Sequence, residues 1–145
     1  MEDEAEGEYE KITEFIESKE ILGGKSILNI LGNANKIKFK GGAHKLRISS
    51  YIDTLYFFGG KRTINVKSSI NNLIIEGGTS KIFVHNFGDC QINNIDISEG
   101  IHEIIIYSFV NELKIIGGTT KIMCNYEISR INKIKILRGV SDIFK

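Results

Sequence analysis

The three histidines are the residues of this chain best suited to chemistry, because imidazole acts both as a metal ligand and as a general acid or base. They are His44, His85 and His102. In the repeat described below, His44 and His102 occupy equivalent positions three turns apart, which is roughly 14 Å at the spacing of stacked strands. His85 occupies a different position. Because every ligand of a zinc ion lies about 2 Å from it, the spacing predicts three surface histidines and no shared metal site.

Other residue types with catalytic or ligating chemistry are also scattered. Cys90 and Cys124 have no motif spacing, which predicts neither a disulfide framework nor a zinc site. The glycine-rich stretch GGKRT at residues 59–63 leads into a strand pattern and not into a helix, which argues against a phosphate-binding loop. Acids such as Asp96 and Glu103 are dispersed and form no general acid–base pair. The sequence therefore predicts a non-enzymatic protein with no catalytic residue, cofactor or metal.

Basic residues concentrate toward the first turns of the repeat, and such a cluster can attract phosphate backbones. They are Lys36, Lys38, Lys40, Lys45, Arg47, Lys61, Arg62, Lys67 and Lys81. Residues 1–22 contain nine acids and two lysines, a charge of −7, so the rest of a chain with net charge +1 carries +8. A solvated basic surface, partly neutralised by this acidic segment, is the favoured interpretation. An anion- or nucleic-acid-binding adaptor is an alternative.

An eighteen-residue repeat positions all of these residues from Gly23 onward. Counted from the double glycine that opens each turn, the turn at residues 59–76 reads GGKRTINVKSSINNLIIE and is apolar at positions 6, 8, 12, 15 and 17. The apolar residues of this turn are Ile64, Val66, Ile70, Leu73 and Ile75. Alternation at 6 and 8, and again at 15 and 17, predicts two short strands per turn. Because such units bury their apolar faces only by stacking, residues 23–145 are predicted to form an all-β β-solenoid, or β-helix, of about six turns.

Two further columns predict sharp corners. Position 2 is glycine in every turn, which predicts a positive φ or close contact between stacked turns. Position 13 is always Asn or Asp, residue types that tolerate left-handed backbone and that form side-chain ladders when stacked. These residues are Asn35, Asp53, Asn71, Asn93, Asn111 and Asn132. Extra residues near 87–90 and 127–130 predict loops on one flank.

Residues 1–22 have a different pattern. Tyr9, Ile12 and Ile16 recur at three- and four-residue spacing, which predicts an acidic tail and an amphipathic helix that ends at Gly23. The predicted organisation is thus tail and helix over 1–22 and solenoid over 23–145. No apolar run approaches the roughly 20 residues that span a bilayer, and acids follow Met1. A cytoplasmic or nuclear location without membrane contact is expected.

The succession of strand, Asn, strand and Gly in SINNLIIEGGTSKIFVHN, residues 69–86, resembles the β-helical domains of the cyclase-associated protein and tubulin-cofactor-C type. The resemblance implies a surface that regulates actin, or tubulin and small GTPases. The cofactor-C branch uses a catalytic arginine in a Gln-x-x-Gln-x-Arg motif. Gln91 is the single glutamine here, so that activity is not implied.

Outward positions of the repeat are apolar in two places, and contiguous exposed apolar patches usually mark covered or binding surfaces. Position 7 and its surroundings give a candidate protein interface of Phe83, Ile105, Tyr107, Met123 and Phe144. A secondary patch on the other predicted sheet consists of Tyr56, Phe58 and Ile74. We expect the predicted helix to cover one of them. The sequence therefore predicts a structural or protein-interaction module within a homo-oligomer or a larger assembly.

Overall fold

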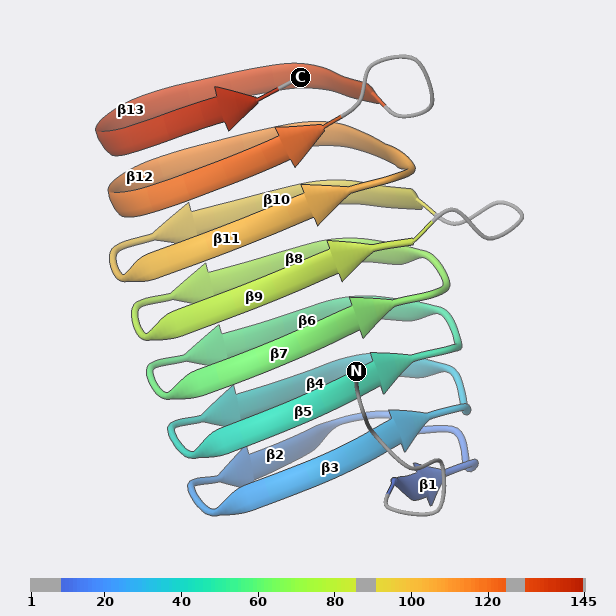
Figure 1. The fold of residues 1–145 in the computed structure, drawn as a ribbon. Helices are drawn as coiled ribbons and strands as arrows, with labels where there is room; N and C mark the ends of the chain where they lie inside the picture. The colour runs from blue at the N-terminus through green and yellow to red at the C-terminus, as the bar shows by residue number, and fades with distance from the viewer. Residues whose placement is uncertain (1–8, 86–90, 125–129, 145) are drawn as a thin grey trace.

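The computed structural model describes residues 9–85, 91–124 and 130–144. Its thirteen strands are all paired in parallel and wind into a flattened coil of about seven turns (Figure 1). Each turn contributes one strand to each of two facing sheets, so the predicted β-solenoid is confirmed. Among the described residues there is no helix, and hence none that could cross a membrane.

The odd-numbered strands form one sheet, called here the odd sheet: β1 (Glu10–Ile12), β3 (Lys25–Ile30), β5 (Ala43–Ile48), β7 (Lys61–Val66), β9 (Thr79–Val84) and β11 (Ile101–Ile106). The even sheet consists of β2 (Lys19–Leu22), β4 (Ala34–Lys40), β6 (Ile52–Phe58), β8 (Ile70–Glu76) and β10 (Gln91–Ser98). The last two strands, β12 (Phe109–Cys124) and β13 (Arg130–Phe144), bend around a corner and contribute to both sheets. The predicted loops near 87–90 and 127–130 fall on residues 86–90 and 125–129, which lie outside the described residues, as does Cys90.

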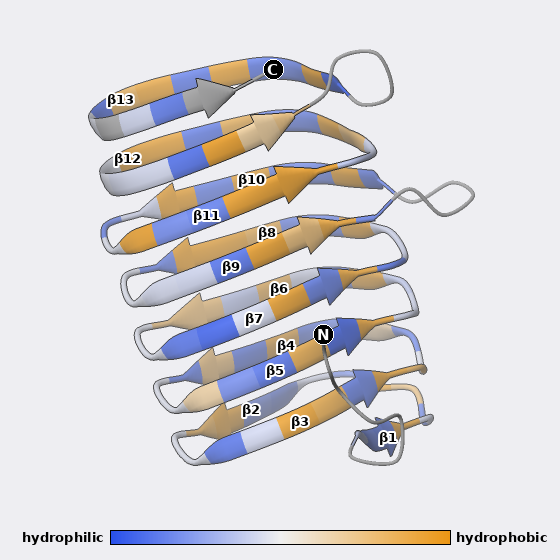
Figure 2. Ribbon diagram, in the orientation of Figure 1, coloured by the Kyte–Doolittle hydropathy of each residue, from blue (hydrophilic) through white to orange (hydrophobic). Residues whose placement is uncertain are grey.

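The core lies between the two sheets and follows the predicted alternation. In the turn at residues 59–76, the five side chains predicted to point inward are all buried: Ile64, Val66, Ile70, Leu73 and Ile75. Figure 2 shows apolar bands recurring along the strands, and the second half of β11, residues 104–106, is apolar throughout. Because equivalent residues pair from turn to turn, as Leu55 with Leu73 and Leu73 with Ile95, apolar columns run along the axis.

The N-terminal helix predicted for residues 1–22 is wrong. Residues of this region form β1 and β2, which pair with β3 and β4. Ile12 pairs with Ile30, Ile16 bridges to Ala34, and Ile21 pairs with Phe39. All three isoleucines pack against the solenoid core. Stacking wins over helix because it buries these side chains and gives the backbone a ready row of hydrogen-bond partners. Residues 1–8 lie outside the described residues.

The glycine corners are confirmed, with both predicted causes acting at once. Gly77 and Gly78 have φ of 76° and 73°. A Cβ on Gly42 would lie 2.6 Å from the carbonyl oxygen of Gly23 in the preceding turn, whereas a Cβ on Gly41 would meet nothing within 4 Å. Position 1 thus requires the left-handed backbone, and position 2 additionally lacks space. Glu99 occupies position 1 with φ of 64°, which fits this difference.

The position-13 column forms the predicted side-chain ladder but not a left-handed corner. The Asn71 amide donates to Asp53 at 3.0 Å, and the Asn93 amide donates to Asn71 at 2.9 Å. Glu99 is the only non-glycine residue with a positive φ in the described parts of the chain. These Asn and Asp residues therefore act through stacked amides at strand starts, as Asn71 does in β8.

We expect Gly78→Ala to destabilise the protein far more than Gly77→Ala. Both residues have a positive φ, so both variants share a backbone penalty of roughly 1–2 kcal/mol. Only a Cβ on residue 78 would collide with the carbonyl oxygen of Gly60 in the preceding turn and with the guanidinium of Arg62. Urea unfolding of the two variants measures the difference. Equal losses would show that backbone conformation alone selects glycine at position 2.

Candidate functional site

The outer face of the odd sheet carries an apolar column where the sequence predicts one. Ile105 pairs with Phe83 on β9 and with Met123 on β12. Phe83 and Ile105 are half-buried, and Met123 is 37% exposed. We call Phe83, Ile105 and Met123 the apolar strip. Phe144 pairs with Met123 through its backbone, but its side chain lies outside the described residues.

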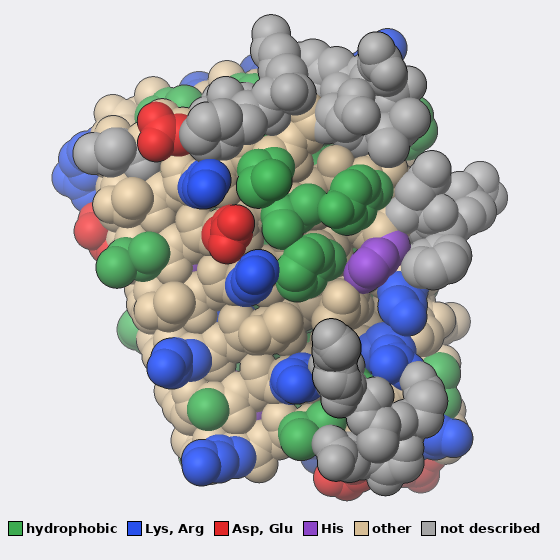
Figure 3. Space-filling view, in the orientation of Figure 1, with side chains coloured by type: hydrophobic (Ala, Val, Ile, Leu, Met, Phe, Trp, Pro, Cys, Tyr) green, Lys and Arg blue, Asp and Glu red, His purple; other side chains and the backbone are tan. Residues whose placement is uncertain are grey.

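Aromatic and imidazole rings extend the strip toward the end of the strands. The His85 ring lies 6.2 Å from that of Phe83 and 6.4 Å from that of Tyr107, measured between centroids. Tyr107 is 41% exposed. The ammonium nitrogen of Lys81 lies 5.5 Å from the Phe83 ring centroid, a cation–π contact. Figure 3 shows the hydrophobic side chains gathered in the upper half of this face, bordered by charged ones.

The secondary patch is present on the even sheet but is more polar than the sequence indicates. Tyr56 and Ile74 pair in register and are half-buried, and Phe58 is exposed. The Tyr56 hydroxyl donates to the Glu76 carboxylate, and Lys38 lies over the Tyr56 ring at 5.1 Å. The hydrogen bond to Glu76, with burial and the carboxylate charge adding to it, raises the pKa of Tyr56 to about 12. These contacts within the chain already satisfy the polar end of the patch.

The prediction of surface histidines is wrong for His44 and His102, which are buried at position 4 and point into the solenoid. The Nε2–H of His44 donates to Gly41 O at 2.9 Å, and that of His102 donates to Glu99 O at 2.7 Å. Each bond satisfies a corner carbonyl three residues earlier. Burial lowers the pKa of both imidazoles; the backbone bonds oppose this shift, and the charge of Arg62 reinforces it. Both rings are therefore neutral near pH 7.

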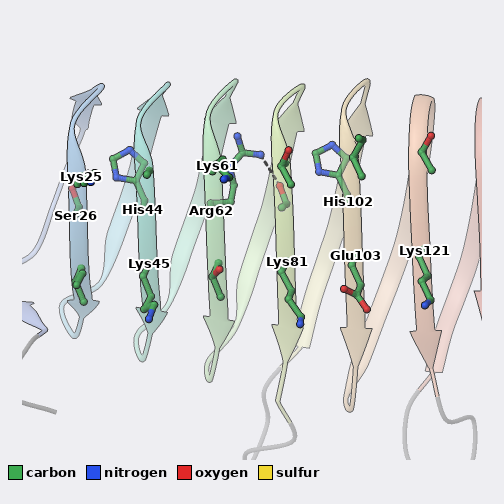
Figure 4. A pocket seen from close by; sticks show the side chains of 17 residues that line it. Lys25, Ser26, His44, Lys45, Lys61, Arg62, Lys81, His102, Glu103 and Lys121 are labelled. Atoms are coloured by element: carbon green, nitrogen blue, oxygen red, sulfur yellow. Dashed lines mark hydrogen bonds between the residues drawn. The ribbon is translucent and has the colours of Figure 1, made fainter. Parts of the chain in front are cut away.

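The sequence predicts that Arg62 belongs to the basic surface, and this prediction is wrong. Arg62 is only 4% exposed and occupies position 4, as His44 and His102 do. Its guanidinium donates to Ser80 Oγ at 2.6 Å (Figure 4), to Gly77 O at 3.3 Å and to Gly60 O at 3.2 Å, and also to Gly59 O. It also lies 5.1 Å from the Phe57 ring centroid. Burial lowers the pKa of Arg62 to about 10, so the side chain stays charged at neutral pH. Arg62 thus joins two consecutive glycine corners.

Position 4 of the repeat carries a column of polar residues at the glycine corner. Its members are Ser26, His44, Arg62, Ser80, His102, Thr120 and Ser141. Three members, His44, Arg62 and His102, donate to corner carbonyls, which an inward side chain at this position can reach. The Ser80 hydroxyl accepts from Arg62, whereas the hydroxyls of Thr120 and Ser141 have no hydrogen-bond partner among the described residues. The sequence signal for this column is the alternation of side chains along a strand. Positions 4, 6 and 8 of one strand lie on the same face, so position 4 points inward together with the apolar positions 6 and 8. The hydrogen bonds of this column stabilise the glycine corners, and its two histidines are separated by intervening turns.

The described residues offer no cluster of three or more His, Cys, Asp or Glu side chains that could hold a metal ion. The Cys124 side chain is buried in the core. Comparison of the chain with protein-family models, curated proteins and solved structures found no match. The apolar strip on the outer face of the odd sheet is the candidate functional site.

Proposed function

We propose that this protein is a non-enzymatic interaction module that binds a protein partner through the apolar strip. The observation that carries the proposal is the strip itself: three neighbouring strands place Phe83, Ile105 and Met123 side by side on one outer face, and Tyr107 extends it. Contiguous apolar surface of this kind is unusual on an isolated soluble protein and usual at interaction sites.

The backbone beneath the strip favours binding. β11 is hydrogen-bonded to β9 on one side and to β12 on the other, so the strip residues sit on a rigid support. Side chains held in place before binding lose less conformational entropy on association. Aromatic residues and Met are also the types enriched in interface cores. The partner is a second copy of this chain, in a homo-oligomer, or another subunit of a larger assembly.

The test is a pair of charge substitutions in the strip, Ile105→Lys with Met123→Glu. We expect the double variant to keep the melting temperature within a few degrees, because both side chains point outward and a lysine stem can still cover the sheet. Association should be lost, because a charge at the centre of an apolar contact is left desolvated and unpaired. Sedimentation velocity measures self-association, and cross-linking in the native cell measures recovery of a different subunit.

The matched control is Ile74→Lys with Ile116→Glu, which changes two half-buried outward isoleucines on the even sheet. It should leave association intact. Loss of association in the control and not in the strip variant would move the interface to the secondary patch. A strip variant that unfolds would show that the strip is part of the core.

A further inference from the structure

A groove with a volume of about 730 Å³ runs across the strands on the outer face of the odd sheet (Figure 4). It extends from β3 to β12 beside the apolar strip. Its walls are the outward side chains at positions 3 and 5, and its floor is the strand backbone at position 4. The two walls are about 7 Å apart, the spacing of alternate residues in a strand. The groove therefore suits an extended chain lying along the solenoid axis.

The walls of this groove carry lysines in an alternating pattern. Lys25 on β3 and Lys61 on β7 belong to the position-3 wall, whereas Lys45 on β5 and Lys81 on β9 belong to the position-5 wall. Each of four successive strands thus contributes one lysine, at intervals of about 4.8 Å along the axis. The wall positions of these four strands include no acid, and the first acid along the groove is Glu103 on β11.

The charge beneath the floor has the same sign. Arg62 lies on the inner side of β7, and its hydrogen-bond partners are carbonyl and hydroxyl oxygens. Among the described residues no carboxylate is hydrogen-bonded to it, and low-dielectric surroundings transmit its field more strongly than water does. The part of the groove over β3 to β9 is therefore a positive, elongated site.

Tyr9 shows which segment of the chain leads onto this face. Its ring lies 4.4 Å from the guanidinium carbon of Arg47, on β5 two residues beyond Lys45. The eight residues before Tyr9 include five acids and no lysine or arginine. Eight residues can reach about 27 Å, whereas Lys81 lies only two strands beyond β5, or about 10 Å along the axis.

We propose that the lysine groove binds the chain's own acidic segment, residues 1–8, through ion pairs between its carboxylates and Lys45, Lys61 and Lys81. Single exposed ion pairs contribute little to binding, so binding depends on several pairs formed along one segment. It should weaken with salt, because the Debye length falls to about 3 Å at 1 M. The groove is distinct from the apolar strip, so this inference does not depend on the proposed function.

The test is zero-length carbodiimide cross-linking of the full chain, followed by peptide mapping of the monomer. We expect cross-links from Glu2, Asp3, Glu4 or Glu6 to the groove lysines, and we expect 1 M salt to suppress them. Cross-links confined to covalent dimers would overturn the proposal and assign the segment to a second copy. Cross-links to the even-sheet lysines alone, or none from residues 1–8, would also overturn it.

A second measurement uses charge reversal in the full chain. Lys45→Glu with Lys61→Glu should shift the amide resonances of residues 2–8 and abolish the cross-links. The matched control, Lys36→Glu with Lys133→Glu, reverses two exposed lysines on the even sheet and should change neither. Equal effects of the two pairs would mean that the segment responds only to overall charge, which contradicts a bound position in the groove.

Discussion

The Ile115→Asp variant should be unfolded at room temperature. Ile115 is fully buried between the two sheets, where it pairs with Ile97 and Ile136 in the neighbouring turns. An aspartate there would lose the packing of a large apolar side chain and would bury an unpaired carboxylate, each at a cost of several kcal/mol. Domains of this size have a total stability of about 5 to 15 kcal/mol. Far-UV circular dichroism and gel filtration measure the loss of strand structure and of compactness.

The matched control is the next residue of the same strand. Ile116 faces outward and is half-buried, and its register neighbours are Ser98 and Arg138. Ile116→Asp introduces the same charge into solvent beside a cation, so we expect a change below about 1 kcal/mol. If Ile115→Asp and Ile116→Asp melt together, the inward assignment of position 17 is wrong.

The contrast between these neighbours shows why the repeat predicts the solenoid well. A strand points successive side chains to opposite faces, so one apolar column fixes the orientation of every residue in the turn. The prediction is strengthened by the repeat, because the same inward position is apolar in each successive turn. The eighteen-residue period alone places Leu73 against Leu55, and the period together with the extra residues near 87–90 places Leu73 against Ile95.

The N-terminal turn escaped prediction because its residues satisfy two patterns at once. Ile12 and Ile16 are four residues apart, as on one face of a helix, but they also lie eighteen residues before Ile30 and Ala34. Local spacing alone cannot choose between these patterns. The exposed edges of β3 and β4 decide the outcome, because they offer backbone partners that a separate helix would leave unused.

The candidate site is predictable only in part. The apolar strip can be predicted because Phe83, Ile105 and Met123 all occupy position 7, which strand alternation places on the outer face. The lysine groove was not predicted because its lysines do not share one position of the repeat. They alternate between position 3 and position 5 in successive strands of the odd sheet, so that each strand from β3 to β9 contributes one lysine. The burial of Arg62 was not predicted, because a charged side chain usually lies at the surface, whereas position 4 points into the core. The carbonyl groups of the glycine corners accept hydrogen bonds from the guanidinium and so stabilise it in the core.

Arg62→Ala should destabilise the protein by about 3 to 5 kcal/mol. The substitution leaves a cavity beside Phe57, and it removes the donors of the carbonyl groups of Gly59 and Gly77 and of the Ser80 hydroxyl. Buried acceptors without donors cost about 1 to 3 kcal/mol each, partly relieved by local relaxation. Urea unfolding measures the loss. Lys61→Ala is the control: it removes the exposed neighbouring cation and should change stability by less than about 0.5 kcal/mol.

Arg62→Met separates the two contributions of the arginine. Methionine fills most of the volume and removes the desolvation penalty of a buried charge, but it leaves the corner carbonyls without donors. Because replacing buried charges with apolar side chains of similar size is often tolerated, we expect a loss of about half that of Arg62→Ala. A loss as large as that of alanine would show that hydrogen bonding to the corners accounts for nearly all of the stabilisation. A loss as small as that of Lys61→Ala would mean that the guanidinium contributes volume alone, and that the glycine corners hold together without it.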